Sequence, residues 1–152
     1  MDQNNSNGLP PFLCSKNPGL RLGLMGGQFT STSLTAENRS LCSPLSIQTL
    51  TSTGDFQDIV SLGLISARRA KEIYENTCYI LAFELLCACQ AVEIRGVSKL
   101  SKITRKAFDL IRKSTPFFSS DESLTEYLEE ISLIISSGKL LEIIESTDNL
   151  PL

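Results

Sequence analysis

The feature that most constrains the fold is the apolar run TCYILAFELLCACQAV, which extends over 16 residues from Thr77 to Val92. The run contains Glu84 and Gln90, and it is shorter than the roughly 20 apolar residues that a membrane-spanning helix needs. We therefore expect a buried helix and no membrane span. Because the run is apolar nearly all round, its surface must be covered on every side, either by a large core or by neighbouring subunits.

The other segments favour an all-α fold, a long-helix bundle with an extended N-terminal arm. Residues 1–19 are rich in Gly and Pro and predict the arm. We expect a helix and a loop in residues 20–54, although the stretch QFTSTSLTAEN is by propensity a poor helix or a strand. Residues 55–96 predict the long central helix, and residues 97–152 predict the C-terminal helices.

Local signals predict where these helices begin and end. The central helix should begin at Asp55 or Ile59, and Gly96 should end it at the position after the C-cap. A capping box of Ser123 with Glu126 predicts the start of a later helix, which Gly138 breaks before a last turn, KLLEIIES. An amphipathic helix that starts near Ser101 and stops before Pro116 is indicated by Ile103, Ala107, Leu110 and Ile111.

Composition excludes several classes of function. A net charge of -3 and a pI near 5.0 give no basic surface of the kind that nucleic-acid binders need, so we expect no nucleic-acid partner. Cys87 and Cys89 point about 200° apart on a helix, and the chain has no histidine, so we expect no metal site. The odd count of 5 cysteines and the lack of a secretory signal favour a reducing cytoplasm.

The residues by themselves indicate no reaction. The chain lacks a histidine for general-base catalysis, a G-x-S-x-G motif and a phosphate-binding glycine loop. Asp55 and Asp58 match the positive end of a helix dipole, where carboxylates cap free N–H groups. We therefore predict no catalytic residue from composition and spacing.

Several ordered motifs resemble the C-terminal part of the family of histidine, phenylalanine and tyrosine ammonia-lyases and the related aminomutases. The central one is QDIVSLGLISARRAKEI, which spans Gln57 to Ile73. It is accompanied, in the order of the family, by GLPPFL, NPGL, GQFTSTSLTAEN, ELLCACQAVEIRG, TRKAFDLIRKSTPFF and SGKLLE. The resemblance implies non-oxidative deamination of phenylalanine, tyrosine or histidine to an arylacrylate and ammonia, or the related 2,3-migration.

The resemblance also implies that essential parts of the enzyme lie outside this chain. The family forms its methylidene-imidazolone prosthetic group from an Ala-Ser-Gly triplet, and the chain contains only SNG (residues 6–8) and STG (residues 52–54). We carry the group over to neither of them, and the catalytic tyrosine of the family has no counterpart here. The isolated chain is therefore expected to be inactive.

One substrate-binding position carries over, and it is Gln57. In the family, the residue before the signature Asp lies at the substrate pocket, where histidine lyases have Glu and phenylalanine and tyrosine lyases usually have Gln. A neutral amide avoids a buried, unpaired charge beside a neutral aryl ring. Gln57 therefore favours an aromatic substrate over histidine, whereas Phe56 resembles the tyrosine-lyase and aminomutase branch.

The resemblance further implies a partner, because family members are tetramers with a central helical bundle. The chain would then form a homo-oligomer or associate with lyase-like subunits, which would cover the run from Thr77 to Val92. The alternative is a free-standing, non-catalytic helical interaction protein or remnant derived from the same family.

Overall fold

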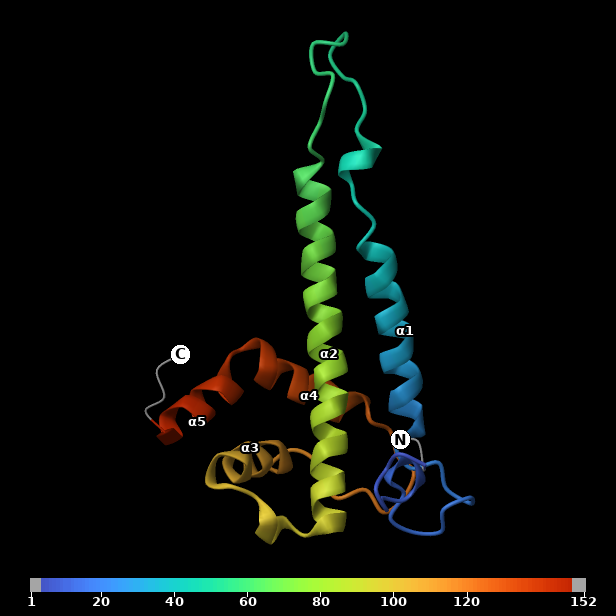
Figure 1. Ribbon diagram of the computed structural model, residues 1–152, viewed down its shortest axis with the longest axis vertical. Helices are drawn as coiled ribbons and strands as arrows, with labels where there is room; N and C mark the ends of the chain where they lie inside the picture. The colour runs from blue at the N-terminus through green and yellow to red at the C-terminus, as the bar shows by residue number, and fades with distance from the viewer. Residues whose placement is uncertain (1–3, 149–152) are drawn as a thin grey trace.

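The computed structural model describes residues 4–148, and the prediction of an all-α chain is confirmed (Figure 1). No strand occurs within these residues, which contain only two isolated β-bridges. The five α-helices are α1 (Met25–Leu41), α2 (Gly63–Arg95), α3 (Lys102–Arg112), α4 (Thr125–Ser136) and α5 (Lys139–Asp148). The described residues also contain three single turns of 3-10 helix: η1 (Pro11–Leu13) before α1, η2 (Ser46–Gln48) between α1 and α2, and η3 (Val97–Lys99) between α2 and α3.

The chain has two regions, which we call the base and the rod (Figure 1). The base contains the N-terminal arm, the C-terminal half of α2 and helices α3, α4 and α5. The rod contains the N-terminal half of α2, Gly63 to Asn76, and residues 42–62, which extend beyond both helices. Helix α1 runs antiparallel to α2 and reaches from the base to the rod.

Helix α1 forms in the stretch for which propensity favoured a poor helix or a strand. Three of its threonines satisfy their hydroxyl groups within the helix, by donating to the carbonyl four residues earlier. Gly27 lets α1 approach α2 so closely that a Cβ atom at this position would overlap the ring of Phe83. Packing against α2 therefore overrides the weak local preference.

Helix α2 begins later than predicted, at Gly63 and not at Asp55 or Ile59. Its N-cap is Leu62, which has a left-handed backbone (φ 53°, ψ 30°) and no side-chain capping hydrogen bond. The prediction that Asp55 and Asp58 cap this helix is therefore wrong. Its C-terminal end is as predicted, because Gly96 has a φ of 104° and donates its N–H to the carbonyl of Val92.

The C-terminal helices match the predicted pattern in all but two details, of which the first is that the predicted last turn is a helix of 10 residues, α5. Ser101 caps α3 by accepting from the N–H of Thr104 (3.3 Å). Gly138, with a φ of 79°, separates α4 from α5. The capping box of Ser123 with Glu126 is wrong, because α4 has Leu124 at its N-cap without a side-chain capping bond.

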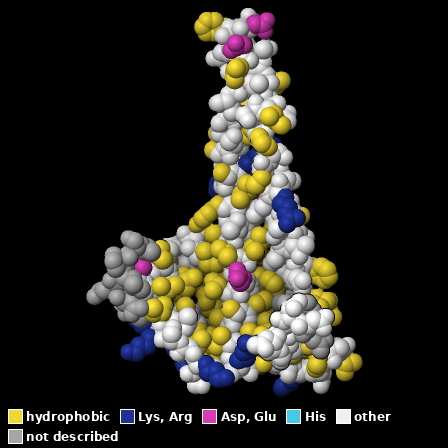
Figure 2. All heavy atoms as spheres, in the orientation of Figure 1, with side chains coloured by type: hydrophobic (Ala, Val, Ile, Leu, Met, Phe, Trp, Pro, Cys, Tyr) yellow, Lys and Arg dark blue, Asp and Glu magenta, His cyan; other side chains and the backbone are white. Residues whose placement is uncertain are grey.

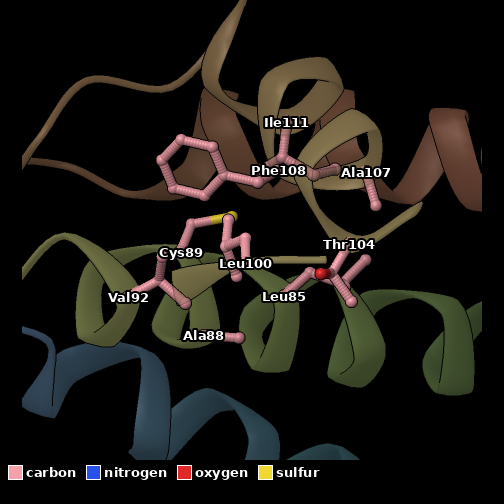
Figure 3. Close-up of a pocket in the computed structure, with 9 residues that line it drawn as sticks. All are labelled: Leu85, Ala88, Cys89, Val92, Leu100, Thr104, Ala107, Phe108 and Ile111. Carbon is pink, nitrogen blue, oxygen red and sulfur yellow. The ribbon is translucent and has the colours of Figure 1, made fainter. Parts of the chain in front are cut away.

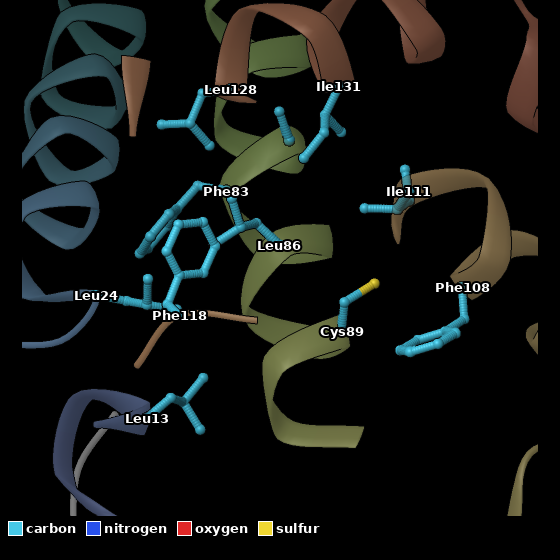
Figure 4. Packing of buried hydrophobic residues seen from close by; sticks show 11 residues of the cluster. Leu13, Leu24, Phe83, Leu86, Cys89, Phe108, Ile111, Phe118, Leu128 and Ile131 are labelled. Atoms are coloured by element: carbon cyan, nitrogen blue, oxygen red, sulfur yellow. The ribbon is translucent and has the colours of Figure 1, made fainter. Parts of the chain in front are cut away.

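The core lies in the base, where α1, α3 and α4 pack around the C-terminal half of α2 (Figure 4). Phe83 and Leu86 of α2 are buried by this chain alone, whereas Leu81 stays 41% exposed. Neighbouring subunits are thus not needed on every side of the apolar run. The buried cluster is made of Leu13, Leu24, Ala82, Phe83, Leu86, Cys89, Phe108, Ile111, Phe118, Leu128 and Ile131.

A buried amide joins the N-terminal arm, α2 and the loop after α3. Gln90 is fully buried; its Nε2 donates to the carbonyls of Phe118 (2.8 Å) and Leu13 (3.4 Å). Its Oε1 accepts from the Phe118 N–H (3.1 Å) and from Arg112 (3.3 Å). Arg112 also donates to the carboxylate of Glu93 (2.8 Å). This ion pair neutralises a guanidinium whose side chain is only 9% exposed.

The N-terminal arm and the residues that follow it are held against the base. In the arm, the Ser15 hydroxyl donates to the carbonyl of Phe118 (3.0 Å). Asp121 accepts hydrogen bonds from the N–H groups of Leu22 (3.1 Å) and Gly23 (2.9 Å), just before α1. Arg21 donates to the carbonyl of Ser119 (2.6 Å). The arm is therefore part of the folded base.

Helix α2 is, within the described residues, the one helix long and apolar enough to cross a membrane by length and composition. The core helix of a soluble protein passes the same test, and 33% of the apolar window is buried inside this chain. This is weak evidence for a span, and no other feature of the described residues indicates a membrane.

The close approach of α1 and α2 gives a direct test of the packing. Gly27→Ala should lower the free energy of unfolding by about 1–3 kcal/mol, because the buried ring of Phe83 must move. Gly26→Ala is the matched control, since a Cβ atom there meets nothing within 4 Å, and it should stabilise by up to about 1 kcal/mol. Chemical denaturation of both variants at one protein concentration measures the difference, and equal stabilities would contradict the packing.

Candidate functional site

Gln57 lies at the far end of the rod, in a short hairpin that is held by its backbone (Figure 1). The N–H of Ser52 donates to the carbonyl of Gln57 (3.0 Å), and the N–H of Gln57 donates to the carbonyl of Ser52 (3.2 Å). A third hydrogen bond, from Phe56 N–H to the Thr53 carbonyl, closes the turn between them (3.2 Å). The residue predicted to bind substrate is thus on a defined turn and not at a helix N-terminus.

The turn contains three consecutive residues with a left-handed backbone. The φ angles are 56° at Thr53, 60° at Gly54 and 65° at Asp55. Glycine adopts this conformation freely, whereas Thr and Asp adopt it at a cost in energy. Such strain is typical of functional turns. The Gly-Asp pair in the sequence is a turn signal that could have placed the hairpin and excluded a helix start at Asp55.

The tip of the rod is open to solvent in this chain. Gln57 and Asp58 are exposed, so the structure does not bring Gln57 together with another candidate group. Large apolar side chains of the segment that carries it are also uncovered: Ile47, Leu50, Phe56 and Ile59 are each more than 70% exposed. Because exposed apolar groups of this size mark interaction surfaces, the tip is a candidate interaction surface.

The base contains an apolar groove between α2 and α3 (Figure 3). Its volume is about 210 Å³, and Thr104 contributes the one hydroxyl side chain of its lining. It lies near the opposite end of α2 from the tip. The groove offers room for apolar side chains and no acid or base for catalysis; it is lined by Leu85, Ala88, Cys89, Val92, Leu100, Thr104, Ala107, Phe108 and Ile111.

The two cysteines of the C-x-C pair are structural. Burial raises the pKa of Cys87 to about 12 and that of Cys89 to about 11, so both thiols stay protonated near neutral pH. A thiol must lose its proton to act as a nucleophile or a metal ligand. Within residues 4–148 we found no group of three or more His, Cys, Asp or Glu side chains that could bind a metal ion.

Sequence reasoning did not identify the buried junction of Gln90, Arg112 and Glu93. The sequence signal for this junction was Gln90, an amide inside an apolar helical run, because a buried polar group must find hydrogen-bond partners. The junction is fully occupied with holding the base together, apart from the Nε atom of Arg112, which has no partner. We therefore assign it a structural role.

The fold and the tip define a helical building block that leaves large apolar side chains uncovered at one end. Comparison with known proteins agrees, because residues 1–113 match the family described as aromatic amino acid lyase. The chain belongs to the aromatic amino acid lyase family.

The similar proteins include ammonia-lyases and aminomutases. The chain is 46% identical over 140 residues to a tyrosine ammonia-lyase of Cupriavidus metallidurans, a match that covers 91% of the chain and 26% of that enzyme. It is 41% identical to a histidine ammonia-lyase of Natranaerobius thermophilus, over 92% of the chain and 27% of that enzyme. The chain thus spans about a quarter of the length of the curated relatives it matches.

Solved structures show the same fold. The phenylalanine aminomutase of Pantoea agglomerans is 57% identical, with a TM-score of 0.86 over 89% of this chain and 26% of that one. The tyrosine aminomutase of Streptomyces globisporus is 38% identical, with a TM-score of 0.94 over all of this chain and 29% of that one. These values confirm an all-α region of the ammonia-lyase fold.

The raised pKa values predict which cysteines react. At pH 8, iodoacetamide should modify the exposed Cys42 quickly and the half-buried Cys87 far more slowly, because the Cys87 thiol stays protonated until the pH approaches about 12. The rate at Cys87 should rise with pH over the range in which the fold persists. Mass spectrometry of the modified peptides measures both rates, and equal rates at pH 8 would contradict the structural role of Cys87.

Proposed function

We propose that this chain is the C-terminal region of an aromatic amino acid ammonia-lyase or aminomutase, and that Gln57 lines its substrate pocket. The observation that carries the proposal is the strained hairpin, which presents Gln57 beyond the ends of α1 and α2. Its exposed apolar neighbours suit a pocket whose other walls come from further protein segments. The signature from Gln57 to Ile73 matches the family at this position.

The substrate of the complete enzyme is proposed to be phenylalanine or tyrosine. Enclosing the tip would desolvate the side chain at position 57, and a neutral amide can enter such a pocket without the cost of an unpaired charge. A Glu at that position would instead favour a substrate ring that carries a positive charge. The printed names of the relatives include both lyases and aminomutases, so the proposal covers elimination and 2,3-migration.

The electrophilic prosthetic group of the family does not fit the residues of this chain. It requires an Ala-Ser-Gly triplet, and the 152 residues contain none. Residues 52–54, Ser-Thr-Gly, instead lie in the hairpin: Ser52 forms the backbone bridge to Gln57, and Thr53 and Gly54 lie in the strained turn. We therefore propose that the group and the catalytic tyrosine come from other segments, and that the isolated chain is inactive.

The proposed partners are further copies or lyase-like subunits, and the proposed location is the cytoplasm. The uncovered apolar side chains of the rod support association with other subunits. All five cysteines are free in the structure, which suits a reducing compartment.

A chimera tests this proposal. The matching C-terminal region of the Cupriavidus tyrosine ammonia-lyase is replaced by this chain, and the release of ammonia and arylacrylate is measured. We expect activity from the chimera and none from the isolated chain, because the chain supplies one wall of the pocket and no electrophile. Activity from the isolated chain would overturn the need for other segments. A correctly assembled but inactive chimera would overturn the fit of this chain to the family.

The same chimera tests the role of Gln57. Gln57→Glu should lower kcat/KM for an aromatic substrate about tenfold or more and improve relative use of histidine, because it buries a charge at the pocket. Gln48→Glu makes the same chemical change at an exposed position of the rod and serves as the control. An unchanged ratio of the two substrates would remove Gln57 from the specificity of the enzyme.

The alternative is a non-catalytic helical interaction protein, and the exposed apolar tip is the observation that favours it. Such a protein would bind a full-length lyase through the rod without adding a pocket residue. Co-purification with an intact lyase whose activity does not respond to Gln57→Glu would support this alternative.

A further inference from the structure

The segment that presents Gln57 has few contacts with the rest of the chain. We call this segment, residues 42–62 between α1 and α2, the tip loop (Figure 1). Leu45 is its one buried residue, and three others are half-buried. Figure 2 shows the narrow end of the rod, with apolar and acidic side chains on its surface. Packing therefore does little to fix the position of Gln57.

In the described part of the chain, two side-chain hydrogen bonds cross the tip loop or join it to a helix. On α2, the guanidinium of Arg69 donates to the carbonyl of Ser43 (3.0 Å), just after the end of α1. Further along, the N–H of Val60 donates to the hydroxyl oxygen of Thr49 (2.8 Å). The first bond fixes the root of the loop. The second joins its outgoing side to its returning side.

The bond between Thr49 and Val60 forms a lower rung below the hairpin. Ser52 and Gln57 form an upper rung through their two backbone hydrogen bonds. Thr49 precedes Ser52 by three residues and Val60 follows Gln57 by three, so the two sides between the rungs are equal in length. The upper rung uses backbone groups that almost any sequence supplies, whereas the lower rung exists because residue 49 has a hydroxyl. The residue at position 49 therefore controls the separation of the two sides.

The strained turn above the upper rung depends on this control. A left-handed backbone at Thr53 and Asp55 persists only where the surrounding structure holds it. Here the surrounding structure consists mainly of hydrogen bonds, because every residue from Leu50 to Ile59 is exposed. Without the lower rung, the turn can relax and the side chain of Gln57 can move.

We propose that Thr49 is a positioning residue for Gln57. Its hydroxyl holds the outgoing side of the tip loop at the distance from the returning side that the hairpin requires. Thr49 does not contact the substrate in this role, and it acts through the backbone of the loop and the amide of Gln57. The inference rests on the proposed function, in which Gln57 lines the substrate pocket.

The place of the lower rung explains why a small change there would reach the pocket. Val60 lies three residues from Gln57 along the returning side, with no buried residue between them. A displacement of the lower rung is therefore passed to Gln57 without being absorbed by packing. Because a misplacement of about 1 Å can cost about 100-fold in rate, such a displacement should lower catalysis measurably.

Amide hydrogen exchange of the full 152-residue chain tests the hold on the hairpin. Thr49→Val removes the hydroxyl and keeps the branched shape of the side chain. It should speed the exchange of the Ser52 and Gln57 N–H groups about twofold to tenfold, which corresponds to the loss of one hydrogen bond. Thr49→Ser keeps a hydroxyl and should restore slow exchange. Thr51→Val is the matched control, because Thr51 is exposed on the same side of the loop and its hydroxyl has no described hydrogen bond.

The chimera with the Cupriavidus enzyme tests whether this hold matters for the substrate. Thr49→Val should lower kcat/KM for tyrosine about tenfold, and Thr49→Ser should retain most of the activity. In a Gln57→Ala background, Thr49→Val should cost little more, because a residue that acts through Gln57 loses its effect when that amide is absent. A general loss of stability would instead lower the activity of both backgrounds by the same factor.

The two experiments separate a failure of this inference from a failure of the proposed function. Inactivity of the unmodified chimera would overturn the proposed function, and the exchange of the 152-residue chain would by itself decide whether Thr49 holds Gln57. Exchange at Gln57 that is equal in the unmodified chain and in Thr49→Val would overturn the positioning role. With an active chimera, equal costs of Thr49→Val in the two backgrounds would overturn it as well, whereas a much smaller cost in the Gln57→Ala background would support it.

Discussion

The buried amide of Gln90 is the interaction on which the rest of the structure depends. An amide that is removed from water must have its donors and acceptor satisfied, and Gln90 finds partners in Leu13, Phe118 and Arg112. These partners belong to the N-terminal arm, the loop after α3 and α3 itself. One side chain therefore determines where three segments meet α2. The base forms around the C-terminal half of α2, and the N-terminal half of α2 extends away from it in the rod.

This arrangement places the stabilising contacts at one end of α2 and the proposed substrate-binding residue beyond the other end. The core, the half-buried ion pair of Arg112 with Glu93 and the clamp of Asp121 all lie in the base. Gln57 lies beyond the other end of α2, on a hairpin that is held by three backbone hydrogen bonds. The rod carries exposed apolar side chains that a solitary domain would bury. Membership in the aromatic amino acid lyase family accounts for this, because the chain spans about a quarter of its relatives.

The helices of the base could be predicted because their signals are local. The spacing of Ile103, Ala107 and Leu110 predicts α3, and Gly96 and Gly138 predict ends at which only a left-handed residue fits. A helix was expected within residues 20–54, but its extent over α1 could not be predicted, because it depends on the close approach of Gly27 to Phe83, which is far away in the sequence. The predicted start of α2 is wrong because the strained turn from Thr53 to Asp55 outweighs the helical signal of two carboxylates.

The candidate site was predictable only in part, and for a related reason. The resemblance identified Gln57 and its neutral amide, because that information is contained in one short motif. It did not place Gln57 in a hairpin, since the motif reads as the start of a helix. The other walls of the proposed pocket are assigned to segments outside this chain, and no pattern in the 152 residues specifies them.

The clamp of Asp121 on the N–H groups of Leu22 and Gly23 has a consequence for how the chain folds. It joins residues 99 and 98 positions apart, so it closes a long loop whose entropy cost grows with its length. The antiparallel pair of α1 and α2 closes a much shorter loop, residues 42–62. We expect this helical hairpin to form early and the arm to dock late, since non-local contacts form slowly. Until the arm docks, Leu13 and Leu24 are missing from the core, so the partly folded chain exposes the apolar surface that it later buries.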